Sequence, residues 1–471
     1  MRDNDIALIG LAVMGQNLAL NMARNNLAVT VYNRTWEKTE AFMSGPARHT
    51  NILAARDIAV CVASLRRPRT ILLMVKAGQA VDSLLDELRP LLEPGDIVMD
   101  GGNSYFEDTI RRMHRLQNAG IFLLGLGVSG GEKGALLGPS LMPGGSAQAW
   151  EQARPILEAI AAKTPDGRPC AAYMGREGSG HLVKMVHNGI EYAVMQLLAE
   201  VHDLLARGLA LTPSQEAALF EGWNMGAGAS YLLEITARIL RTRDSLTDAP
   251  ILDVIGDRAG SKGTGLWTMQ TALALGAPVP TISAAVEARL LSALARGRET
   301  AARGLDGPGT GQGDVDAALL GQGLLTATLA AYAQGFGLLR SAETAWGWGL
   351  KPAAVARVWQ AGCIIRAAFL DDLEASLARE ANPDSLVLAP AFAGPLSRGH
   401  LALRRVVGLA TKLGIPAPAL SASLAWYDGC RSVRLPSNLI QAQRDYFGAH
   451  GFERTDQTGL HHGPWSDRMG A

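Results

Sequence analysis

The sequence of 471 residues predicts an α/β domain built on a parallel sheet, followed by a large all-α domain and a C-terminal tail. Two observations carry this prediction. Up to about residue 180, short apolar runs alternate with helical patterns, as is typical of βαβ units. Beyond that point Ala and Leu recur at helical spacing, and alternating β-branched patterns are lost. We therefore expect three parts, residues 1–179, 180–435 and 436–471, which suits a chain too long for one core.

The expected strands are short apolar segments, each followed within three residues by Gly, Asn or Asp and then by a helical pattern. They are Ile6–Ile9, Val29–Tyr32, Ile71–Val75, Ile97–Met99 and Ile121–Leu124. The carboxyl ends of parallel strands lie along one edge of a sheet, where open α/β sheets bind their ligands. The loops that follow these strands should therefore carry the binding residues.

The first strand leads into a glycine-rich turn, Gly10-Leu11-Ala12-Val13-Met14-Gly15, and then into a helix. Gly10 permits the tight turn, the small Ala12 leaves room for a pyrophosphate, and Gly15 allows close packing of helix on strand. The N-terminus of the helix favours phosphate charge. The pattern predicts a Rossmann-type dinucleotide-binding domain; a merely tight turn between strand and helix is the alternative.

The end of the second strand predicts which dinucleotide is bound. An NAD-binding domain usually places Asp or Glu there, against the ribose hydroxyls, whereas this chain has Asn33-Arg34-Thr35. A cation and two hydrogen-bonding side chains suit a 2′-phosphate, so NADP is favoured over NAD. The alternative for Arg34 is a solvated surface charge. Val75, Lys76 and Ala77 after the third strand, and Asn103 after the fourth, should lie where nicotinamide and substrate meet.

A polar stripe follows one face of an expected helix beyond residue 180. At roughly 100° per residue, Lys184, His187, Asn188 and Glu191 fall within an arc of about 100°. The opposite face is apolar and consists of Leu182, Val186, Ile190, Ala193 and Leu197. Such a stripe can be the solvated face of a surface helix. However, His and Asn beside one Lys and one Glu form a mixed set of acid, base and hydrogen-bonding groups, which favours catalysis.

A second glycine-dense segment, Gly125–Gly134, contains Ser129-Gly130-Gly131. Glycine alone would indicate a loop. A serine followed by two glycines can present several backbone N–H groups, which form a nest for a carboxylate or a hydroxyl-rich substrate.

Bulk composition excludes several kinds of partner. The 44 basic and 44 acidic side chains cancel, so we expect no nucleic acid and no anionic membrane as partner. No segment approaches the roughly 20 apolar residues of a membrane span, and the N-terminus has no signal-like apolar region. The four separated cysteines suit reduced thiols in the cytoplasm, and no cluster has metal-ligand spacing. After Pro436 the chain is polar and irregular, like a tail that another surface must order.

Several of these segments together resemble the decarboxylating 6-phosphogluconate dehydrogenases, in order over essentially the whole chain. They are Gly10–Met22, Val75–Val81, Asp100–Ser104, Gly127–Gly134, Gly138–Gly145, Val183–Tyr192, Lys262–Gly265 and Asn438–His450. The stretch Gln441–His450 is very specific to the long form of that family. The Gly-x-Ala-x-x-Gly turn and the pair of Lys184 and Asn188 occur more widely, across the β-hydroxyacid dehydrogenase superfamily.

The resemblance implies oxidation of 6-phosphogluconate at carbon 3 by NADP, followed by loss of the carbon 1 carboxylate. The products would be ribulose 5-phosphate, carbon dioxide and NADPH. A ketone β to a carboxylate loses carbon dioxide with only a proton donor as help, so no metal is expected. By position in the motifs, Lys184 would be the base that takes the hydroxyl proton and then returns it to the enolate oxygen. Glu191 would protonate carbon 1 of the enediol.

The resemblance also implies the remaining contacts with the substrate. Its carboxylate and hydroxyls would meet Asn103, Ser129, Gly130, Gly131, His187 and Asn188. Its phosphate would meet Tyr192, Lys262, Thr264 and Arg289, together with Arg444 and His450 from the tail of a partner subunit. We therefore expect a homodimer with exchanged tails.

Two alternatives stay open at the level of the sequence. A 3-hydroxyisobutyrate-type dehydrogenase would need neither the phosphate cluster nor a long second domain. A non-catalytic NADP-binding regulator should have lost Lys184 or Glu191, and both are present. Small departures from the family pattern, such as Ser261 where many members carry Gln, remove no reactive group.

Overall fold

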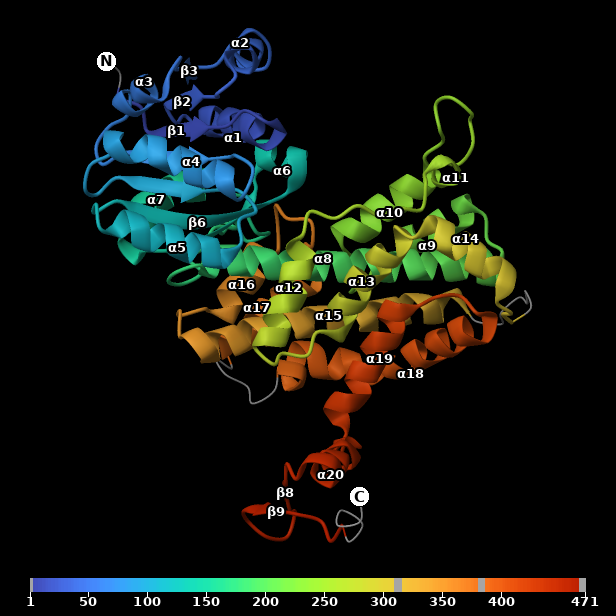
Figure 1. Cartoon of the computed structure of the whole chain (residues 1–471). Helices are drawn as coiled ribbons and strands as arrows, with labels where there is room; N and C mark the ends of the chain where they lie inside the picture. Colours follow the sequence, from blue (N-terminus) through green and yellow to red (C-terminus); the bar gives the residue numbers. More distant parts are fainter. Residues whose placement is uncertain (1–2, 309–315, 380–385, 466–471) are drawn as a thin grey trace. The chain divides into compact units, whose positions relative to one another are not determined.

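A computed structural model describes residues 3–308, 316–379 and 386–465 (Figure 1). The chain forms two compact units, Met1–Leu424 and Ala425–Ala471, which are considered separately below. The first unit begins with a mostly parallel sheet covered by helices and continues as helices. The second contains a helix and two short strands. The expected fold class is therefore confirmed.

The sheet of the first unit has the strand order β3-β2-β1-β4-β5-β6-β7. The strands are β1 (Ile6–Ile9), β2 (Val29–Tyr32), β3 (Leu53–Ala54), β4 (Thr70–Leu73), β5 (Ile97–Asp100), β6 (Phe122–Ser129) and β7 (Ser140–Gly145). Neighbouring strands are parallel from β3 to β6, and β7 is antiparallel to β6. All five predicted strands exist. The sequence did not indicate β3, which has only two residues, or β7, which contains Pro143 and two glycines.

Helices cover both faces of this sheet (Figure 1). One core joins the sheet to α1 (Val13–Arg24), α6 (Gly131–Leu137) and α7 (Ala147–Ile160), and the other joins it to α3 (Ile58–Ala63), α4 (Gln79–Leu88) and α5 (Phe106–Gln117). The helix α2 (Trp36–Ser44) follows β2 and buries Phe42 in the first core. From β1 the chain first builds β2 and β3 on one side, then crosses to β4 on the other. This reversal opens a crevice at the carboxyl ends of β1 and β4.

The helical part is organised around α8 (Ser179–Asp203), a helix of 25 residues that packs on β6 and β7 at its start. The predicted apolar face is confirmed, since Leu182, Val186, Ile190, Ala193 and Leu197 are all fully buried. The other helices are α9 (Pro213–Trp223), α10 (Tyr231–Arg241), α11 (Ile251–Val254), α12 (Thr264–Ala274), α13 (Pro280–Ser292), α14 (Ala295–Gly304), α15 (Ala317–Trp346), α16 (Pro352–Val358), α17 (Phe369–Arg379), α18 (Pro390–Leu413) and α19 (Pro418–Arg431). Of these, α12, α13 and α15 pack directly against α8.

The second unit contains α20 (Ser437–Gly448) and the antiparallel pair β8 (Phe452–Glu453) and β9 (Leu460–His461). Its centre is the buried carboxylate of Asp445. This carboxylate accepts hydrogen bonds from the backbone N–H groups of Gly451 and Gly463, from His462 Nδ1 and from Trp465 Nε1. Burial opposes ionisation, but these donors outweigh it and hold the pKa of Asp445 well below its usual range.

No helix among the described residues has the length and apolar character needed to cross a membrane. Within the same residues, no group of three or more His, Cys, Asp or Glu side chains could hold a metal ion.

Candidate active site

The crevice between β1 and β4 opens into a cavity of about 520 Å³. Eight of the predicted cofactor residues line it: Gly10, Leu11, Ala12, Asn33, Arg34, Thr35, Val75 and Lys76. Val13, Met14 and Gly15 do not line this cavity and form the start of α1. Ala77 and Asn103 lie in the loops after β4 and β5, also outside the lining of the cavity.

Close packing explains the glycines of the turn after β1. Gly10 has φ +106°, and a Cβ there would lie 2.5 Å from Met74 O, at the end of β4. A Cβ on Gly15 would lie 1.9 Å from Gly10 O. Neither position therefore accepts a side chain without backbone movement. The turn is held in the geometry that brings backbone N–H groups and the N-terminus of α1 to a phosphate.

Asn33 ties this turn to the end of β2. Its Oδ1 accepts a hydrogen bond from Leu11 N at 3.0 Å, and its Nδ2 donates to Thr35 O at 2.9 Å. The amide is thus engaged at both ends with backbone. The geometry points to Asn33 as a support of the turn, which leaves Arg34 and Thr35 to face the cavity.

A second cation, Lys38, lines the cavity close to Arg34 and Thr35. Arg34, Thr35 and Lys38 are exposed, and the Thr35 hydroxyl makes no capping hydrogen bond to α2. Two cations and an available hydroxyl suit a phosphate dianion. Lys38 was not predicted from the sequence, although its position four residues after Arg34, near the start of a helix, is a usable signal.

Glycines also let α8 approach the sheet. A Cβ on Gly127 of β6 would lie 2.6 Å from Lys184 Cβ, and a Cβ on Gly144 of β7 would lie 2.2 Å from Gly180 N. The strand that was expected to end at Leu124 continues to Ser129 as β6. Glycine is needed there because a helix crosses the strand in direct contact with its backbone.

The predicted polar stripe is buried rather than solvated. Lys184 is 7% exposed, His187 is fully buried and Asn188 is 8% exposed. Lys184 Nζ donates to Asn188 Oδ1 at 2.5 Å and lies 3.4 Å from His187 Nδ1. Glu191 Oε2 lies 3.7 Å from His187 Nδ1, so the four side chains form one cluster, here called the lysine cluster.

Burial sets the protonation of the lysine cluster. It lowers the pKa of Lys184, and the negative charge of Glu191 only partly opposes this effect. Burial, together with the positive charge of Lys184, lowers the pKa of His187 well below its usual value, so the imidazole is neutral. For Glu191 burial raises the pKa, against the charges of Lys184, Arg289 and Lys262. The lysine is thus suited to act as a base and the glutamate as an acid.

Ser129 and the two glycines after it adjoin the lysine cluster. Ser129 Oγ lies 3.0 Å from His187 Nε2. Gly130 has φ +128° and is the N-cap of α6, and Gly131, with φ +62°, is the first residue of that helix. Gly130 packs against a segment that the sequence analysis missed, because its Cβ would lie 2.6 Å from Gly362 O.

The loop between α16 and α17, which contains Gly362, also brings a thiol close to Lys184. Cys363 is fully buried, and burial raises its pKa to about 12, against the positive charge of Lys184. No sequence motif connects the loop between α16 and α17 with α8, so only the fold could identify it as a wall of the site.

Four predicted phosphate residues come from three neighbouring elements: Tyr192 from α8, Lys262 and Thr264 from the start of α12, and Arg289 from the last turn of α13. The guanidinium of Arg289 lies 3.4 Å from the centre of the Tyr192 ring, and Lys262 N donates to Tyr192 Oη at 3.4 Å. Thr264 is the first residue of α12, after Gly263 in the left-handed conformation. A helix N-terminus with two nearby cations is suited to an anion.

The two remaining predicted residues, Arg444 and His450, belong to the second unit. Both are exposed. Arg444 Nη1 donates to Gln441 Oε1 at 3.0 Å, and Gln441 Nε2 in turn donates to Gly451 O at 2.5 Å. These bonds hold the end of α20 and the turn that carries His450 in one arrangement.

The fold and the site together define a class of enzyme. A dinucleotide crevice with cations at its ribose end, and a buried lysine beside histidine, asparagine and glutamate, are the parts of an NADP-dependent dehydrogenase that acts on a hydroxyl group.

Comparison with known proteins then identifies the family. Residues 5–175 match the model of the NAD binding domain of 6-phosphogluconate dehydrogenase, and residues 180–465 match that of the 6-phosphogluconate dehydrogenase C-terminal domain. The chain belongs to the 6-phosphogluconate dehydrogenase family.

Individual relatives are similar to this chain over almost their full length. The decarboxylating 6-phosphogluconate dehydrogenase of Synechococcus elongatus is 50% identical over 97% of this chain and 98% of its own. The NADP(+)-dependent decarboxylating enzyme of Bacillus subtilis is 47% identical over 99% of this chain and 100% of its own. The structure of 6-phosphogluconate dehydrogenase from Plasmodium falciparum, studied as apoenzyme, with NADP+ and with 6-phosphogluconate, superposes with a TM-score of 0.94. It is 40% identical and covers 98% of this chain and 100% of its own.

Proposed function

We propose that this chain catalyses the oxidative decarboxylation of 6-phosphogluconate to ribulose 5-phosphate and carbon dioxide, with reduction of NADP to NADPH. One observation carries the proposal: Lys184 is buried beside His187, Asn188 and Glu191, on the helix that packs against the ends of the dinucleotide-binding sheet. Full-length relatives that carry this activity in their names support it.

The cavity fits NADP. The Gly10–Ala12 turn and the N-terminus of α1 would hold the pyrophosphate, and Arg34, Thr35 and Lys38 would hold the 2′-phosphate. Val75, Lys76, Ala77 and Asn103 would border the nicotinamide end. When bound, NADP supplies the acceptor for the hydride that leaves carbon 3 of the substrate.

Lys184 would act first as a base and then as an acid. As a neutral amine it takes the proton of the carbon 3 hydroxyl while the C–H electron pair leaves with the hydride. The bond between carbons 1 and 2 then breaks, carbon dioxide departs, and the electron pair moves to the carbon 3 oxygen. Lys184 returns its proton to that oxygen, which gives an enediol. A buried ammonium is a good donor here because burial favours its neutral form.

Glu191 would complete the reaction. Burial raises its pKa and so favours the protonated carboxyl more than in an exposed glutamate, and this carboxyl would protonate the enediol carbon that becomes carbon 1 of the product. At the same time Lys184, neutral again after the previous step, would take the proton of the enediol hydroxyl on the neighbouring carbon, so that a ketone forms. His187 and Asn188 would hold Lys184 and the substrate hydroxyls in place.

The remaining predicted residues would recognise the two ends of the substrate. Ser129, Gly130 and Gly131 would meet the carboxylate, with Asn103 and Asn188 on the neighbouring hydroxyls. Tyr192, Lys262, Thr264 and Arg289 would meet the phosphate. The chain has no net charge, so this local cluster supplies the attraction for the anion.

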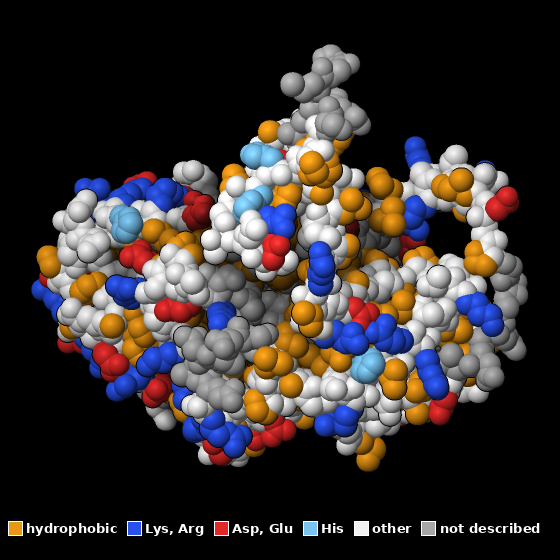
Figure 2. Space-filling view, turned by 90° about the horizontal axis from the view of Figure 1, so that it is seen from below, with side chains coloured by type: hydrophobic (Ala, Val, Ile, Leu, Met, Phe, Trp, Pro, Cys, Tyr) orange, Lys and Arg blue, Asp and Glu red, His pale blue; other side chains and the backbone are white. Residues whose placement is uncertain are grey.

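We further propose that Arg444 and His450 reach the phosphate of a partner subunit, in a homodimer with exchanged tails. Apolar side chains are exposed in both units, and Figure 2 shows groups of them on one face, between Lys, Arg, Asp and Glu. In the first unit they include Leu273, Leu290, Leu291 and Leu294, on or beside α12 and α13, and in the second unit Leu439, Ile440 and Phe447, all at least 55% exposed. Such surfaces indicate an interface that a partner covers.

Two further proposals concern the chain as a whole. We propose the boundaries 1–179, 180–435 and 436–471. The first is supported by the two family models, which meet between residues 175 and 180. The second rests on the start of α20 at Ser437, whereas the compact units divide earlier, between Leu424 and Ala425. All four cysteines are free and three are buried, which supports a reducing compartment such as the cytoplasm.

The activity can be tested with a spectrophotometric assay of NADPH formation. The substrate 6-phosphogluconate is compared with gluconate and with 3-hydroxyisobutyrate, each with NADP and with NAD, and released carbon dioxide is measured in parallel. We expect turnover with 6-phosphogluconate and NADP, with one carbon dioxide per NADPH, and almost none with gluconate, which lacks the phosphate. Faster oxidation of 3-hydroxyisobutyrate, or oxidation without carbon dioxide, would contradict the proposal.

A further inference from the structure

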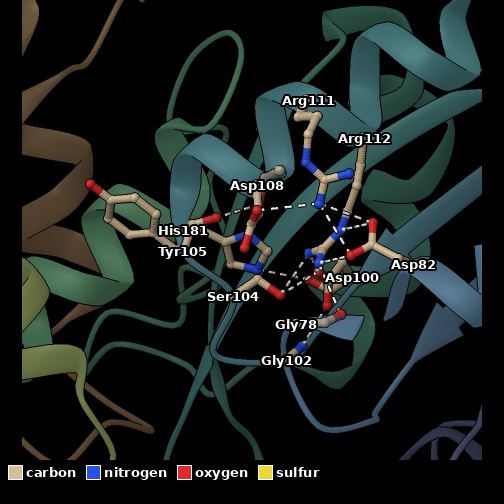
Figure 3. A network of polar contacts seen from close by, with 11 residues as sticks. Gly78, Asp82, Asp100, Gly102, Ser104, Tyr105, Asp108, Arg111, Arg112 and His181 are labelled. Carbon is tan, nitrogen blue, oxygen red and sulfur yellow. Dashed lines mark hydrogen bonds and ion pairs between the residues drawn. The ribbon is translucent and has the colours of Figure 1, made fainter. Parts of the chain in front are cut away.

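The interior of the dinucleotide-binding part contains a charged side chain that the chemistry above does not use. Arg112 of α5 is fully buried and points beneath the loops at the carboxyl ends of β4 and β5 (Figure 3). Its Nε and Nη2 bind the two oxygens of Asp82 at 3.0 and 2.9 Å. A buried guanidinium is costly to desolvate unless all its donors are engaged. The other contacts of Arg112 therefore show which segments the guanidinium holds in place.

The remaining donors of Arg112 reach two different loops. Nη2 also donates to Gly78 O at 3.0 Å, and Gly78 ends the loop after β4, which carries Val75 and Lys76. Nη1 lies 3.3 Å from Ser104 Oγ and 3.4 Å from Asp100 Oδ2. These two residues flank the loop after β5, in which Asn103 lies.

Hydrogen bonds within the loop after β5 also stabilise its conformation. Asp100 Oδ1 accepts from Gly102 N at 3.0 Å, and its Oδ2 accepts from Ser104 Oγ at 2.6 Å. The backbone carbonyl of Asp100 accepts from Nε2 of the buried His181, at the start of α8, at 3.0 Å. One connected network thus runs from α4 through Arg112 to the helix that carries Lys184 (Figure 3).

The neighbouring residue on the same helix provides a contrast. Arg111 Nη2 also binds Asp82, at 3.0 and 3.1 Å, but its side chain is 51% exposed, and its other ion-pair partner among the described residues is Asp108. The two arginines share a helix and a carboxylate. They differ in burial and in contact with the loops, which makes Arg111 a matched control.

We propose that Arg112 is a positioning residue for hydride transfer: its guanidinium fixes the loops after β4 and β5, so that Lys76 and Asn103 hold the nicotinamide against the substrate. This inference rests on the proposed function. The role needs a planar fork with five donors, because one group must serve Asp82, Gly78 O and Ser104 at once. A lysine at this position keeps the charge but reaches fewer of these partners.

The test compares Arg112→Lys with Arg111→Lys in the full-length enzyme. In Arg112→Lys we expect kcat to fall about 10- to 100-fold, because small misplacements at the reacting centre cost this much. The primary isotope effect with 6-phosphogluconate deuterated at carbon 3 should rise, since hydride transfer becomes slower relative to the other steps. Binding of 6-phosphogluconate without cofactor, measured by calorimetry, should stay within about twofold, and Arg111→Lys should leave all three quantities unchanged.

A second variant distinguishes a positioning effect from a general loss of folding. Ser104→Ala removes only the link between the loop after β5, Asp100 and Arg112, and should change kcat and the isotope effect in the same direction by a smaller factor. If both substitutions act through the loop after β5, kcat of the double variant Arg112→Lys with Ser104→Ala should fall less than the product of the two single effects. An unchanged isotope effect in both single variants would overturn the positioning role, even if their melting temperatures fell. A wild-type chain without activity on 6-phosphogluconate would instead refute the proposed function.

Discussion

The chemistry proposed for Lys184 depends on its surroundings rather than on its presence. An exposed lysine is an ammonium at neutral pH and cannot accept a proton. In this chain burial lowers the pKa of Lys184, while Asn188 Oδ1 accepts one of its hydrogen bonds and holds the amine on the side of His187. The sequence placed these groups on one helix face, but it could not show that the face is buried.

Replacing Lys184 by Ala should remove the base and leave the cofactor cavity intact. We expect kcat to fall by about 10²- to 10⁴-fold, the range typical of general acid–base catalysis. The affinity for NADP, measured by fluorescence titration, should change little, because Lys184 does not line that cavity. Lys163→Ala, at an exposed lysine, is the control for the removal of a lysine side chain. Near-normal turnover in Lys184→Ala would show that another group is the base.

Arg34 should decide the choice between the two dinucleotides. In Arg34→Asp a carboxylate would face the 2′-phosphate, and kcat/KM with NADP should fall about 10- to 100-fold, since charged hydrogen bonds of this kind contribute roughly 1.5–3 kcal/mol. The rate with NAD should change much less or improve. Arg48→Asp makes the same charge change at an exposed position outside the cavity lining and should leave the ratio of the two rates as it is. An unaltered preference in Arg34→Asp would remove Arg34 from the cofactor site.

Residue types in short motifs were the part of the site that could be predicted from the sequence. The turn at Gly10, Arg34 after β2 and the stripe on α8 each depend on local spacing. Lys38 was missed although it is close to Arg34 in the chain. The contributions of Arg112 and of the loop that contains Gly362 could not be predicted in the same way, because each acts through contacts between segments distant in the chain. Arg112, for example, lies 30 residues from Asp82 and 12 from Asp100.

At the scale of elements, the position of α8 is set by the absence of side chains on its neighbours. Gly127 and Gly144 leave no space that a Cβ could occupy, so the backbone of α8 lies directly on β6 and β7. Dense glycine normally indicates a loop, and the expected strand was accordingly ended at Leu124, before the glycines that continue it to Ser129. This continuation was recognisable only once the helix that crosses it was known. The strands β1, β2, β4 and β5 were predictable because their apolar runs are buried on both faces.

A second buried acid, near the far end of α8, makes stability depend on pH. Glu200 is 2% exposed, and its carboxylate accepts hydrogen bonds from Ala419 N, Leu420 N and Gln196 Nε2, which places it at the N-terminus of α19. Burial raises its pKa from 4.5 to about 7, and these donors only partly offset the effect. A raised pKa in the folded state means that the stabilising contribution is full below pH 4.5 and is lost as the pH rises through about 7.

Glu200→Gln should remove this dependence. From the two pKa values, the wild-type chain should lose about 3 kcal/mol of stability from this group between pH 4.5 and pH 7. The melting temperature of the wild type should therefore fall more steeply with rising pH than that of Glu200→Gln, measured by scanning fluorimetry at the same pH values. Glu299→Gln, at an exposed glutamate of α14, should follow the wild type. If the melting temperatures of Glu200→Gln and of the wild type changed with pH in parallel, Glu200 would be excluded as the titrating group.

For the whole molecule, the central question is whether one chain holds a complete phosphate site. Lys262, Thr264 and Arg289 lie together in the first unit, whereas Arg444 and His450 belong to a separate unit stabilised around Asp445. The polar and irregular chain after Pro436 predicts a tail that another surface must order. Local pattern does not identify that surface, because it depends on assembly; the partner subunit was expected only from the family resemblance.

Complementation between two inactive variants can show whether the tail of one subunit completes the active site of its partner. Lys184→Ala lacks the base, and Arg444→Ala should lack a phosphate contact, so each homodimer should have low activity with 6-phosphogluconate. In a dimer with exchanged tails, a mixed pair contains one site with both residues intact and one site with neither. Co-expression with different affinity tags, followed by purification through both tags, isolates the mixed pair. Its activity should approach half that of the wild type, since one of its two sites is complete.

Each outcome of that experiment has a structural meaning. If the tail served its own chain, the mixed pair would contain one site without Lys184 and one without Arg444, and its activity would stay near the average of the two parent variants. That result would refute tail exchange and leave the catalytic proposal standing. A control pair of Lys184→Ala with Arg289→Ala should show no recovery, because both residues lie in the first unit and each site then lacks one of them. Recovery with Arg444→Ala but not with Arg289→Ala would place the tail of one subunit in the active site of its partner.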